Sequence, residues 1–295
     1  MIRKMSFSSD VRKTLCKVPE ECEFCIVAEL AGIMSFSGQL NADKLKFVTE
    51  KKFIAEKIVC DILKSTGEKV TYSGDRNIKI EISDENLLKS IREKTGFARE
   101  DFEKSLKSEC CKRAYIRGAF LGGGCVANPN RNYHLEFDTR YKISAKRLFN
   151  VISECGISPK LTYRKGHYLV YLKGSDDIAD ILGLMGDNMS ALNFYTVQME
   201  KDVRNSINRQ INCEMANQKK TSKAASRQLA AIKKIRANSA MKKLPEVLQE
   251  IAEVREKYPD ISLKELGEML SPPLGKSGVN HRLNRIIEYA ENNFN

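Results

Sequence analysis

The chain contains an internal duplication, and this duplication limits the possible folds more than any other feature of the sequence. An apolar, helix-like segment at 24–38 ends at a glycine, and a segment of the same pattern recurs at 110–124, which is 86 residues later. The segments that follow also correspond. The first copy continues with a strand-like run at 44–49, an amphipathic helix at 51–64, a strand pair at 70–73 and 77–82, and a closing helix at 84–95. The second copy continues in the same order with 133–140, 144–154, 160–164 and 168–173, and 175–184. Two copies of helix–strands–helix–strands–helix predict a pseudo-twofold domain of the α/β (α+β) class.

The rest of the chain is expected to be helical. Residues 190–236 lack proline and are rich in helix-forming residues, so we expect one long helix or two broken ones with a polar, basic surface. A compact three-helix pattern starts at Pro245. The predicted organisation is a duplicated domain at 1–195, a basic helical linker at 196–243 and a small all-α domain at 244–295.

The C-terminal segment carries clear helix boundaries. A first helix is expected at 245–257, and a second at 262–270 starts with a capping box in which Ser262 is followed three residues later by Glu265. A Pro-Pro-Leu-Gly turn leads to a third helix, with Ser277 as its expected N-cap. The apolar positions expected to face inward are Val247, Leu248, Ile251 and Val254 in the first helix and Val279, Leu283, Ile286 and Ile287 in the third.

The third of these helices has the features of a recognition helix in a helix-turn-helix. No acid occurs between Glu268 and Glu288, although 244–295 holds nine acids against six bases. Arginine and asparagine bind guanine and adenine through paired hydrogen bonds, and a helix N-terminus holds phosphate. The residues expected to contact DNA are Lys264, Lys276, Ser277, Asn280, His281, Arg282, Asn284 and Arg285. The alternative is an ordinary helical bundle with a solvated charged face, and the turn is longer than the three or four residues usual in the motif.

The positive charge of the chain is concentrated in one tract. The chain has 50 basic and 38 acidic residues and a net charge of +12, and residues 201–243 contribute +10 of it through twelve bases and two acids. Such a tract indicates a polyanionic partner, and it favours double-stranded DNA as the partner of the neighbouring third helix. The residues expected to give non-specific electrostatic support are Lys219, Lys220, Lys223, Arg227, Lys233, Lys234 and Arg236.

The two repeated helices carry a motif. Leu30-Ala-Gly-Ile-Met-Ser-Phe-Ser-Gly38 resembles the motif of the LAGLIDADG homing endonucleases, and Ile116-Arg-Gly-Ala-Phe-Leu-Gly-Gly-Gly124 resembles it more weakly. The resemblance implies two αββαββα halves whose central helices pack closely through the small residues Ala31, Gly32, Gly118 and Ala119. In that family an acid precedes the last glycine of each helix, and the two acids hold divalent metal ions for DNA hydrolysis. Here these positions are Ser37 and Gly123, which supply no carboxylate, so we expect no catalytic residue and no metal there.

An alternative to a lost nuclease centre is that Asp43 or Asp138 replaces the missing acids, which would leave a metal-dependent DNA endonuclease of the LAGLIDADG type. The outward face of the strand at 133–140 carries Glu136 and Asp138. Acids on that face oppose contact with phosphate, so we do not expect the duplicated domain to bind DNA tightly by itself.

The whole chain resembles the WhiA family of Gram-positive bacteria, in which a LAGLIDADG-like domain without its acids precedes a helical linker and a C-terminal helix-turn-helix. The stretches that carry the resemblance are 6–12, 117–126, 133–137 and, most specifically, 263–286. The resemblance implies a non-enzymatic DNA-binding protein that acts as a transcription regulator or nucleoid-associated factor in cell division, chromosome segregation or sporulation. A further alternative is an interaction scaffold whose duplicated domain binds a transcription or cell-division protein, with DNA binding secondary.

Four of the nine cysteines fall at the starts of the two repeated helices. Cys22 and Cys25 have the spacing of half a zinc or redox site. The repeat aligns Cys25 with Cys111, next to Cys110, so the four thiols are expected to lie close together. Because the paired spacing is absent from the second copy and buried cysteines are common, we expect neither a metal ion nor another cofactor.

The sequence predicts no membrane span and no secretion signal. No apolar run approaches the ~20 residues that cross a bilayer, and the N-terminus lacks the apolar stretch of a signal peptide. The odd number and scattered spacing of the cysteines are typical of a reducing compartment. We therefore expect a cytoplasmic protein, and the family resemblance implies that it is nucleoid-associated. We expect no small-molecule substrate.

Overall fold

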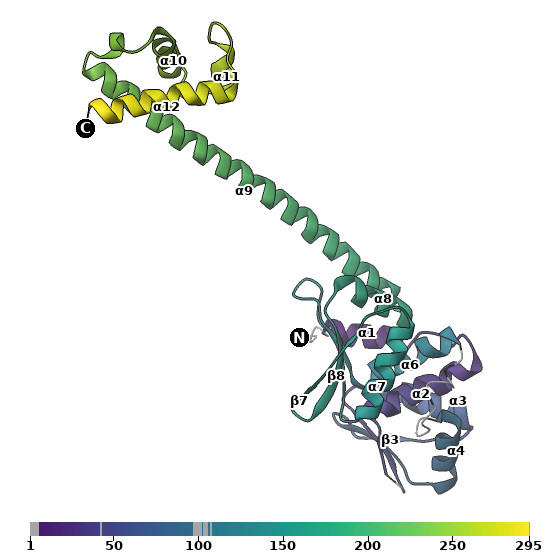
Figure 1. Cartoon of the computed structure of the whole chain (residues 1–295). Helices are drawn as coiled ribbons and strands as arrows, with labels where there is room; N and C mark the ends of the chain where they lie inside the picture. Colours follow the sequence, from purple (N-terminus) through teal and green to yellow (C-terminus); the bar gives the residue numbers. More distant parts are fainter. Residues whose placement is uncertain (1–5, 42, 97–101, 103–105, 107, 295) are drawn as a thin grey trace. The chain divides into compact units, whose positions relative to one another are not determined.

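The computed structural model describes residues 6–41, 43–96, 102, 106 and 108–294 (Figure 1). Two compact units make up the chain, Met1–Asp202 and Val203–Asn295. The three-part division with boundaries after 195 and 243 stays a prediction.

The first unit contains the two copies of αββαββα that the sequence predicts, so the predicted fold class is confirmed. The first copy consists of α2 (Glu23–Ser37), β1 (Gln39–Leu40), β2 (Leu45–Thr49), α3 (Lys52–Thr66), β3 (Tyr72–Ser73), β4 (Ile78–Ile82) and α4 (Glu85–Thr95). The second consists of α6 (Glu109–Gly123), β5 (Gly124–Val126), β6 (Leu135–Thr139), α7 (Lys142–Glu154), β7 (Lys160–Arg164), β8 (His167–Leu172) and α8 (Ser175–Met185).

Each copy forms a four-stranded antiparallel sheet with the same strand order. The orders are β1-β2-β4-β3 and β5-β6-β8-β7. The alternation in the sequence does not indicate β1 and β5, because strands of two or three residues have no period to detect. Phe137 on β6 lies 6.2 Å from Phe36 and 5.9 Å from Phe120 between ring centroids, so the inner face of this sheet packs on both central helices.

The spacing between the two copies changes within the repeat. α6 begins 86 residues after α2 (109 minus 23), whereas β6, α7 and α8 each begin 90 residues after β2, α3 and α4. The segment between β5 and β6 has eight residues and the segment between β1 and β2 has four, which accounts for the difference. The offset of 86 residues therefore aligns the central helices but not the elements that follow β1 and β5.

A helix that the sequence analysis missed, α1 (Phe7–Leu15), precedes the first copy. The Ser6 hydroxyl caps it by accepting a hydrogen bond from the Ser9 backbone N–H at 3.3 Å. Val11 and Leu15 of α1 are buried in the core of the first unit. A serine before a short amphipathic run was the signal that would have indicated this helix.

The central helices α2 and α6 approach each other so closely that only glycine fits at the contact. A Cβ added at Gly32 would lie 2.3 Å from the carbonyl oxygen of Tyr115, and one added at Gly118 would lie 2.0 Å from the carbonyl oxygen of Glu29. The close approach through Gly32 and Gly118 that the motif implies is therefore present.

Four buried charged side chains surround this helix contact. Arg117 of α6 donates to Glu29 of α2 at 2.8 Å, and Lys57 of α3 lies 3.4 Å from Glu29 and donates to Asp61 at 2.7 Å. None of the four side chains is more than 8% exposed. Burial raises the pKa of Asp61 to about 7, although Lys57 opposes this shift. The cluster joins the first copy of the repeat to the second, and apolar periodicity did not indicate it.

The second unit is a helical bundle that includes the end of a long helix. α9 (Asn188–Ala237) is one continuous helix of 50 residues, which decides between the two alternatives left open by the sequence. η1 (Met241–Lys243), α10 (Glu246–Lys257), α11 (Leu263–Glu268) and α12 (Lys276–Asn293) follow it. The core of the bundle includes Ile232 and Ile235 of α9 together with apolar residues of α10, α11 and α12.

The inward face of α10 differs from the prediction. Leu248 and Ile251 are buried as expected, but Val254 is half-buried and Val247 is 45% exposed. Val247 directly precedes Leu248, and neighbouring side chains on a helix point ~100° apart, so the two do not share the face that meets the core. The prediction that Val247 faces inward was therefore wrong.

The charged residue Arg255 occupies the core at the end of α10. It is 1% exposed, and it donates to the Gln228 side chain of α9 at 3.0 Å and to the Ile261 carbonyl oxygen at 2.8 Å. These bonds connect α9, α10 and the segment before α11. A hydrophobic pattern does not reveal such a residue, because both of its partners lie outside its own helix.

We expect Gly118→Ala to destabilise the first unit by ~1–3 kcal/mol, because the added methyl group meets backbone atoms that cannot rotate away. Gly183→Ala is the matched control. Gly183 also lies in a helix, α8, but the nearest atom to its added Cβ is 3.8 Å away. Alanine there should stabilise the helix by up to ~1 kcal/mol. Urea unfolding measures the stability of both variants, and hydrogen exchange of the α2 and α6 amides gives the local readout. Equal stability of Gly118→Ala and Gly183→Ala would contradict the close helix contact.

Candidate nucleic-acid interface

The candidate recognition helix is α12, which carries no acidic residue before Glu288. Gly275 precedes it in an extended conformation, and the Gly275 carbonyl oxygen accepts a hydrogen bond from the Val279 N–H at 3.0 Å. Gly275 is therefore the N-cap, and the expectation that Ser277 caps this helix was wrong. The helix begins at Lys276, so Ser277 lies within its first turn, where its hydroxyl makes no capping bond.

Apolar and polar side chains occupy opposite sides of α12. The four predicted positions Val279, Leu283, Ile286 and Ile287 are buried, and so is Ala290. The exposed positions before Glu288 are Lys276, Ser277, Asn280, His281, Asn284 and Arg285, and Glu288, Glu291, Asn292 and Asn293 are exposed in the last turns. Arg282 lies between the two sides and is only partly exposed. The structure thus presents six of the seven expected contact residues of this helix to solvent, with Arg282 at the edge of the surface, while contact with DNA stays a prediction.

The turn before α12 depends on a close backbone contact. The Leu274 N–H donates to the Gly267 carbonyl oxygen at 2.9 Å, and a Cβ added at Gly267 would lie 1.9 Å from the Leu274 carbonyl oxygen. Gly267 belongs to α11, so this contact folds the long Pro-Pro-Leu-Gly turn back onto that helix. The contact positions the N-terminus of α12 relative to α11.

The predicted capping box of α11 is present. The Ser262 side chain accepts from the Glu265 N–H at 3.3 Å, and the Ser262 N–H donates to the Glu265 carboxylate at 2.8 Å. This backbone hydrogen bond holds the pKa of Glu265 below its usual value. Lys264, the expected DNA contact in α11, is 80% exposed and lies 4.0 Å from Glu268.

The basic tract lies mostly on the exposed surface of α9. Lys219, Lys220, Lys223, Lys233 and Lys234 are all exposed. Arg227 and Arg236 are exposed too, but they form ion pairs with Glu291 at 2.7 Å and with Glu256 at 2.6 Å. Because these two arginines already hold acids of the bundle, we expect the lysines to contribute more of the support for DNA.

The positions of the expected lost nuclease acids lie at the C-terminal ends of α2 and α6. The Ser37 hydroxyl donates to the Ile33 carbonyl oxygen at 2.9 Å. A Cβ added at Gly123 would lie 2.4 Å from the Asp138 carbonyl oxygen and 3.2 Å from the Cβ of Phe36. The two helix ends therefore meet, as the motif implies. Ser37 has no carboxylate, and Gly123 leaves no room for a side chain unless the backbone shifts.

The acids suggested as replacements have other surroundings. Asp138 lies 2.5 Å from the Nδ1 atom of His167, and its neighbour on the same strand face, Glu136, lies 3.0 Å from the Nε2 atom of His134. Asp43 is exposed in the segment between β1 and β2. Within 6–41, 43–96, 102, 106 and 108–294, no three acids or histidines cluster closely enough to hold a metal ion.

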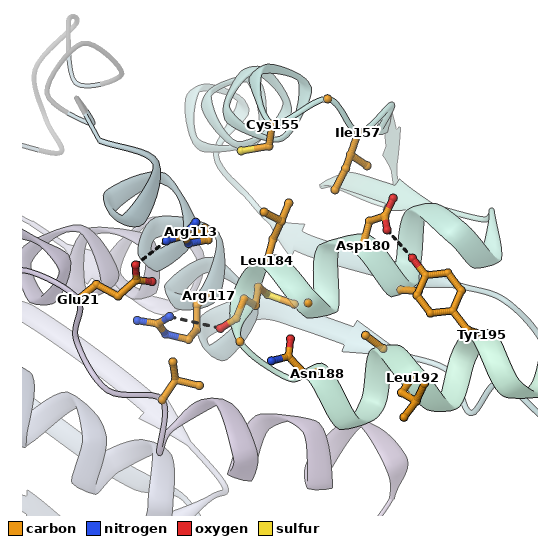
Figure 2. Close-up of a pocket in the computed structure, with 17 residues that line it drawn as sticks. Glu21, Arg113, Arg117, Cys155, Ile157, Asp180, Leu184, Asn188, Leu192 and Tyr195 are labelled. Atoms are coloured by element: carbon orange, nitrogen blue, oxygen red, sulfur yellow. Dashed lines mark hydrogen bonds and ion pairs between the residues drawn. The ribbon is translucent and has the colours of Figure 1, made fainter.

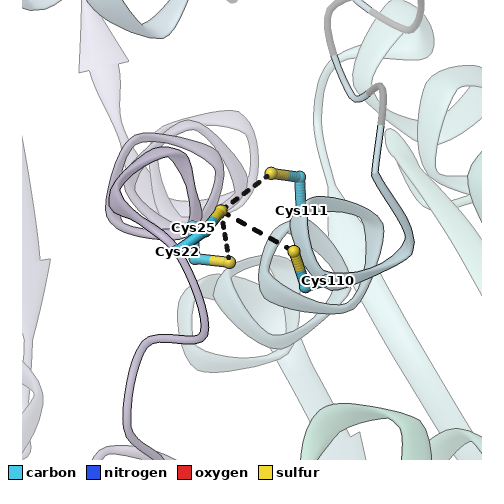
Figure 3. A group of neighbouring side chains, drawn as sticks. All are labelled: Cys22, Cys25, Cys110 and Cys111. Atoms are coloured by element: carbon cyan, nitrogen blue, oxygen red, sulfur yellow. Dashed lines mark hydrogen bonds between the residues drawn. The ribbon is translucent and has the colours of Figure 1, made fainter.

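The structure brings together the four cysteines at the starts of the two repeated helices. The Sγ atoms of Cys22, Cys25, Cys110 and Cys111 all lie within 4.8 Å of one another (Figure 3). Cys22 and Cys25 come from the start of α2, and Cys110 and Cys111 come from the first turn of α6. The expectation that these thiols are close in space is confirmed.

A pocket of about 830 Å³ opens on the first unit beside α6, α8 and the start of α9 (Figure 2). Its main charged groups are paired: Arg113 donates to Glu21 at 2.5 Å, Arg117 to the Met185 carbonyl oxygen at 3.3 Å and Tyr195 to Asp180 at 2.6 Å. The bond to Asp180 raises the pKa of Tyr195 to about 12. The absence of a small-molecule substrate and the presence of a protein partner on this unit both stay predictions.

The helices of the described part of the chain include none that is long and apolar enough to span a membrane.

Two family models match the second copy of the repeat and the C-terminal part of the chain. Residues 207–290 match the family model of the WhiA C-terminal HTH domain, and residues 112–204 match that of the WhiA LAGLIDADG-like domain. The probable cell division protein WhiA of Clostridium tetani is 41% identical over 310 residues, which cover 97% of this chain and 98% of the relative. The protein of the same name from Alkaliphilus metalliredigens is 36% identical with the same coverage.

Solved structures share the fold. Full-length DUF199/WhiA from Thermotoga maritima matches with a TM-score of 0.61 at 24% identity, over 98% of this chain and 99% of that chain. The N-terminal LAGLIDADG domain of DUF199/WhiA matches with a TM-score of 0.52 at 19% identity, over 63% of this chain and 93% of that one. Both likenesses agree with a duplicated αββαββα domain, and the first extends over both units.

We expect Gly267→Ala to destabilise the second unit by ~1–3 kcal/mol, because the new methyl group overlaps the Leu274 carbonyl oxygen. Gly275→Ala is the matched control in the same turn. No atom lies within 4 Å of its added Cβ, so it should lose less than ~1 kcal/mol, the usual effect of a changed N-cap. Hydrogen exchange of the α11 and α12 amides reports on this unit alone. Equal protection in the two variants would show that the contact between Gly267 and Leu274 does not hold the turn.

Proposed function

The chain belongs to the WhiA family, and from this premise we propose that it binds double-stranded DNA through α12, acts in bacterial cell division and does not cut DNA. The single observation that carries the proposal is the surface of α12. Between Lys276 and Ile287, one side of the helix is buried in the bundle, and the other exposes two asparagines, a histidine, a lysine and an arginine; the first exposed acid of the helix is Glu288.

The chemistry of this surface suits the major groove. Arg285 can donate two hydrogen bonds to guanine, and Asn280 and Asn284 can each pair with adenine, while an α-helix fits the width of the groove. Lys276 and Ser277 lie in the first turn of α12, where free backbone amides attract phosphate. Side chains with these donors and acceptors favour reading of base edges over purely electrostatic binding.

The relatives supply the proposed cellular context. They carry the name probable cell division protein WhiA and align over nearly their whole length. We propose that this chain is a transcription regulator or a nucleoid-associated factor in cell division, chromosome segregation or sporulation. It would then lie in the cytoplasm, at the nucleoid.

The first unit is proposed to be a scaffold without catalytic function. The support is the loss of both carboxylates at the helix ends, where Ser37 bonds its own helix and Gly123 has no space for a side chain. A two-metal site needs charged oxygen ligands to hold hard cations against water.

We expect Arg285→Ala and Arg282→Ala each to lower the affinity for a specific duplex by ~1–3 kcal/mol, which is a 5- to 150-fold rise in Kd. Each change removes a donor to a base edge. Lys89→Ala is the control, because it removes the same charge from an exposed residue of α4 in the first unit. Fluorescence anisotropy at one fixed salt concentration measures binding to a duplex selected from a random pool. Binding by both arginine variants as tight as that of Lys89→Ala would refute the proposed role of α12.

We expect the triple substitution of Lys219, Lys220 and Lys223 by alanine to weaken binding to all duplexes alike. The slope of log K against log salt concentration should become shallower by ~0.9 for each phosphate that the variant no longer neutralises. The matched control replaces the exposed lysines Lys13, Lys89 and Lys146 of the first unit with alanine. If both triple variants keep the slope of the parent protein, the tract does not contact phosphate.

We expect no metal-dependent cleavage by the full chain. Supercoiled plasmid and the selected duplex, incubated with Mg²⁺ or Mn²⁺, should stay intact on a gel, because no pair of acids remains to hold the ions. A preparation of Asp138→Asn serves as the control for contaminating nuclease. Nicking by the parent protein that Asp138→Asn abolishes would support the alternative of an active endonuclease.

A further inference from the structure

The four thiols at the N-terminal ends of α2 and α6 have the arrangement of ligands around a single ion. The Sγ atom of Cys22 lies 3.4 Å from that of Cys25, 3.6 Å from that of Cys110 and 3.8 Å from that of Cys111. All six pairwise separations are within 4.8 Å (Figure 3). Two thiols from each helix face the same small volume, so no sulfur has to cross another element to reach it.

We propose that Cys22, Cys25, Cys110 and Cys111 bind one zinc ion. Zinc in protein sites of four cysteines is tetrahedral with Zn–S distances of ~2.3 Å, and this geometry places neighbouring sulfur atoms ~3.8 Å apart. The sulfur separations around Cys22 already lie within a few tenths of an ångström of that value. The sequence led us to expect no metal because the second copy lacks the CxxC spacing, but adjacent cysteines in the first turn of α6 supply two ligands equally well.

The same distances argue against a disulfide and against an iron–sulfur cluster at these four cysteines. A disulfide needs sulfur atoms ~2.05 Å apart, and all four cysteines are free thiols. A [4Fe–4S] cluster attaches each thiolate to a different iron atom, and a [2Fe–2S] cluster divides its four thiolates between two iron atoms, so in both the four sulfur ligands are spread over a larger volume than four ligands that share one ion. Thiolate ligands in a tetrahedral set favour zinc among the common divalent metals.

The surroundings of the thiols suit an anionic metal-thiolate group. Cys22 is the N-cap of α2, Cys25 lies in the first turn of α2, and Cys110 and Cys111 lie in the first turn of α6. The positive ends of both helix dipoles therefore meet at the sulfur atoms and stabilise negative charge there. The Ser108 hydroxyl lies 3.1 Å from the Cys110 Sγ, where it can donate a hydrogen bond that orients this ligand.

The proposed ion would have a structural role. Four protein ligands complete a tetrahedron and leave no open position for water or substrate, which distinguishes structural from catalytic zinc. Cys25 and Cys110 are 85 residues apart in sequence (110 minus 25), so the ion would link the two copies of the repeat. It would do so at the N-terminal ends of α2 and α6, whereas Ser37 and Gly123 lie at their C-terminal ends. The site is therefore distinct from the lost nuclease centre.

The direct test measures the metal content of the full chain purified under reducing conditions from zinc-supplemented medium. Inductively coupled plasma mass spectrometry should find one zinc ion per chain. Cys22→Ser and Cys111→Ser should each reduce the zinc content at least fivefold. The matched controls are Cys60→Ser and Cys213→Ser, which remove exposed cysteines of α3 and α9 and should retain the full zinc content.

Two further measurements on the parent protein do not depend on whether a variant folds. Replacement of zinc by Co²⁺ should produce the visible absorption bands of a tetrahedral cobalt thiolate. Removal of zinc by a chelator should lower the Tm of the first unit, and added zinc should restore it, because an ion bound only by the folded chain stabilises it.

Three results would overturn the proposal. They are a zinc content of the parent protein near background, retention of zinc by Cys22→Ser and Cys111→Ser, or mass spectrometry that shows a disulfide among the four cysteines under the same reducing conditions. Each result is independent of DNA binding, so a failure of the zinc proposal can be distinguished from a failure of the proposed function.

Discussion

The close contact between α2 and α6 is the constraint on which the first unit depends. Gly32 and Gly118 bring the two backbones so near that a single methyl group at either position meets a carbonyl oxygen. This approach buries Glu29 and Arg117 against each other, and it brings Phe36 and Phe120 together on Phe137 of the second sheet. The duplicated halves are thereby held as one unit with a shared core.

The helix pair has two ends with different chemistry. At the C-terminal ends, the positions where a nuclease of this fold holds its acids are a serine bonded to its own helix and a glycine without space for a side chain. At the N-terminal ends, four thiols converge within the distances that one tetrahedral ion requires. The same fold that supports metal-dependent hydrolysis in one family is thus proposed to use metal here only as a link between its halves.

The proposed recognition surface of the second unit depends on contacts that lie away from that surface. Arg255 connects α9, α10 and the segment before α11 from inside the core, and Gly267 allows the Pro-Pro-Leu-Gly turn to fold against α11. The contact between Gly267 and Leu274 positions the N-terminus of α12 relative to α11. The side chains proposed to read DNA are exposed because the opposite side of the helix completes the bundle core.

The sequence by itself determined the duplication, the class of each repeat, the capping box at Ser262 and the inward side of α12, because these follow from local patterns of apolar and capping residues. It did not reveal α1, the exposure of Val247, the burial of Arg255 or the true N-cap of α12. The burial of Arg255 depends on partners outside its own helix, and a periodic pattern identifies a buried face without identifying its partner. The other three had local signals that the apolar pattern alone does not contain. The repeat placed four cysteines near one another; only the tertiary structure decided that their sulfur atoms share one volume, because distances of a few ångströms depend on how closely the two helices pack.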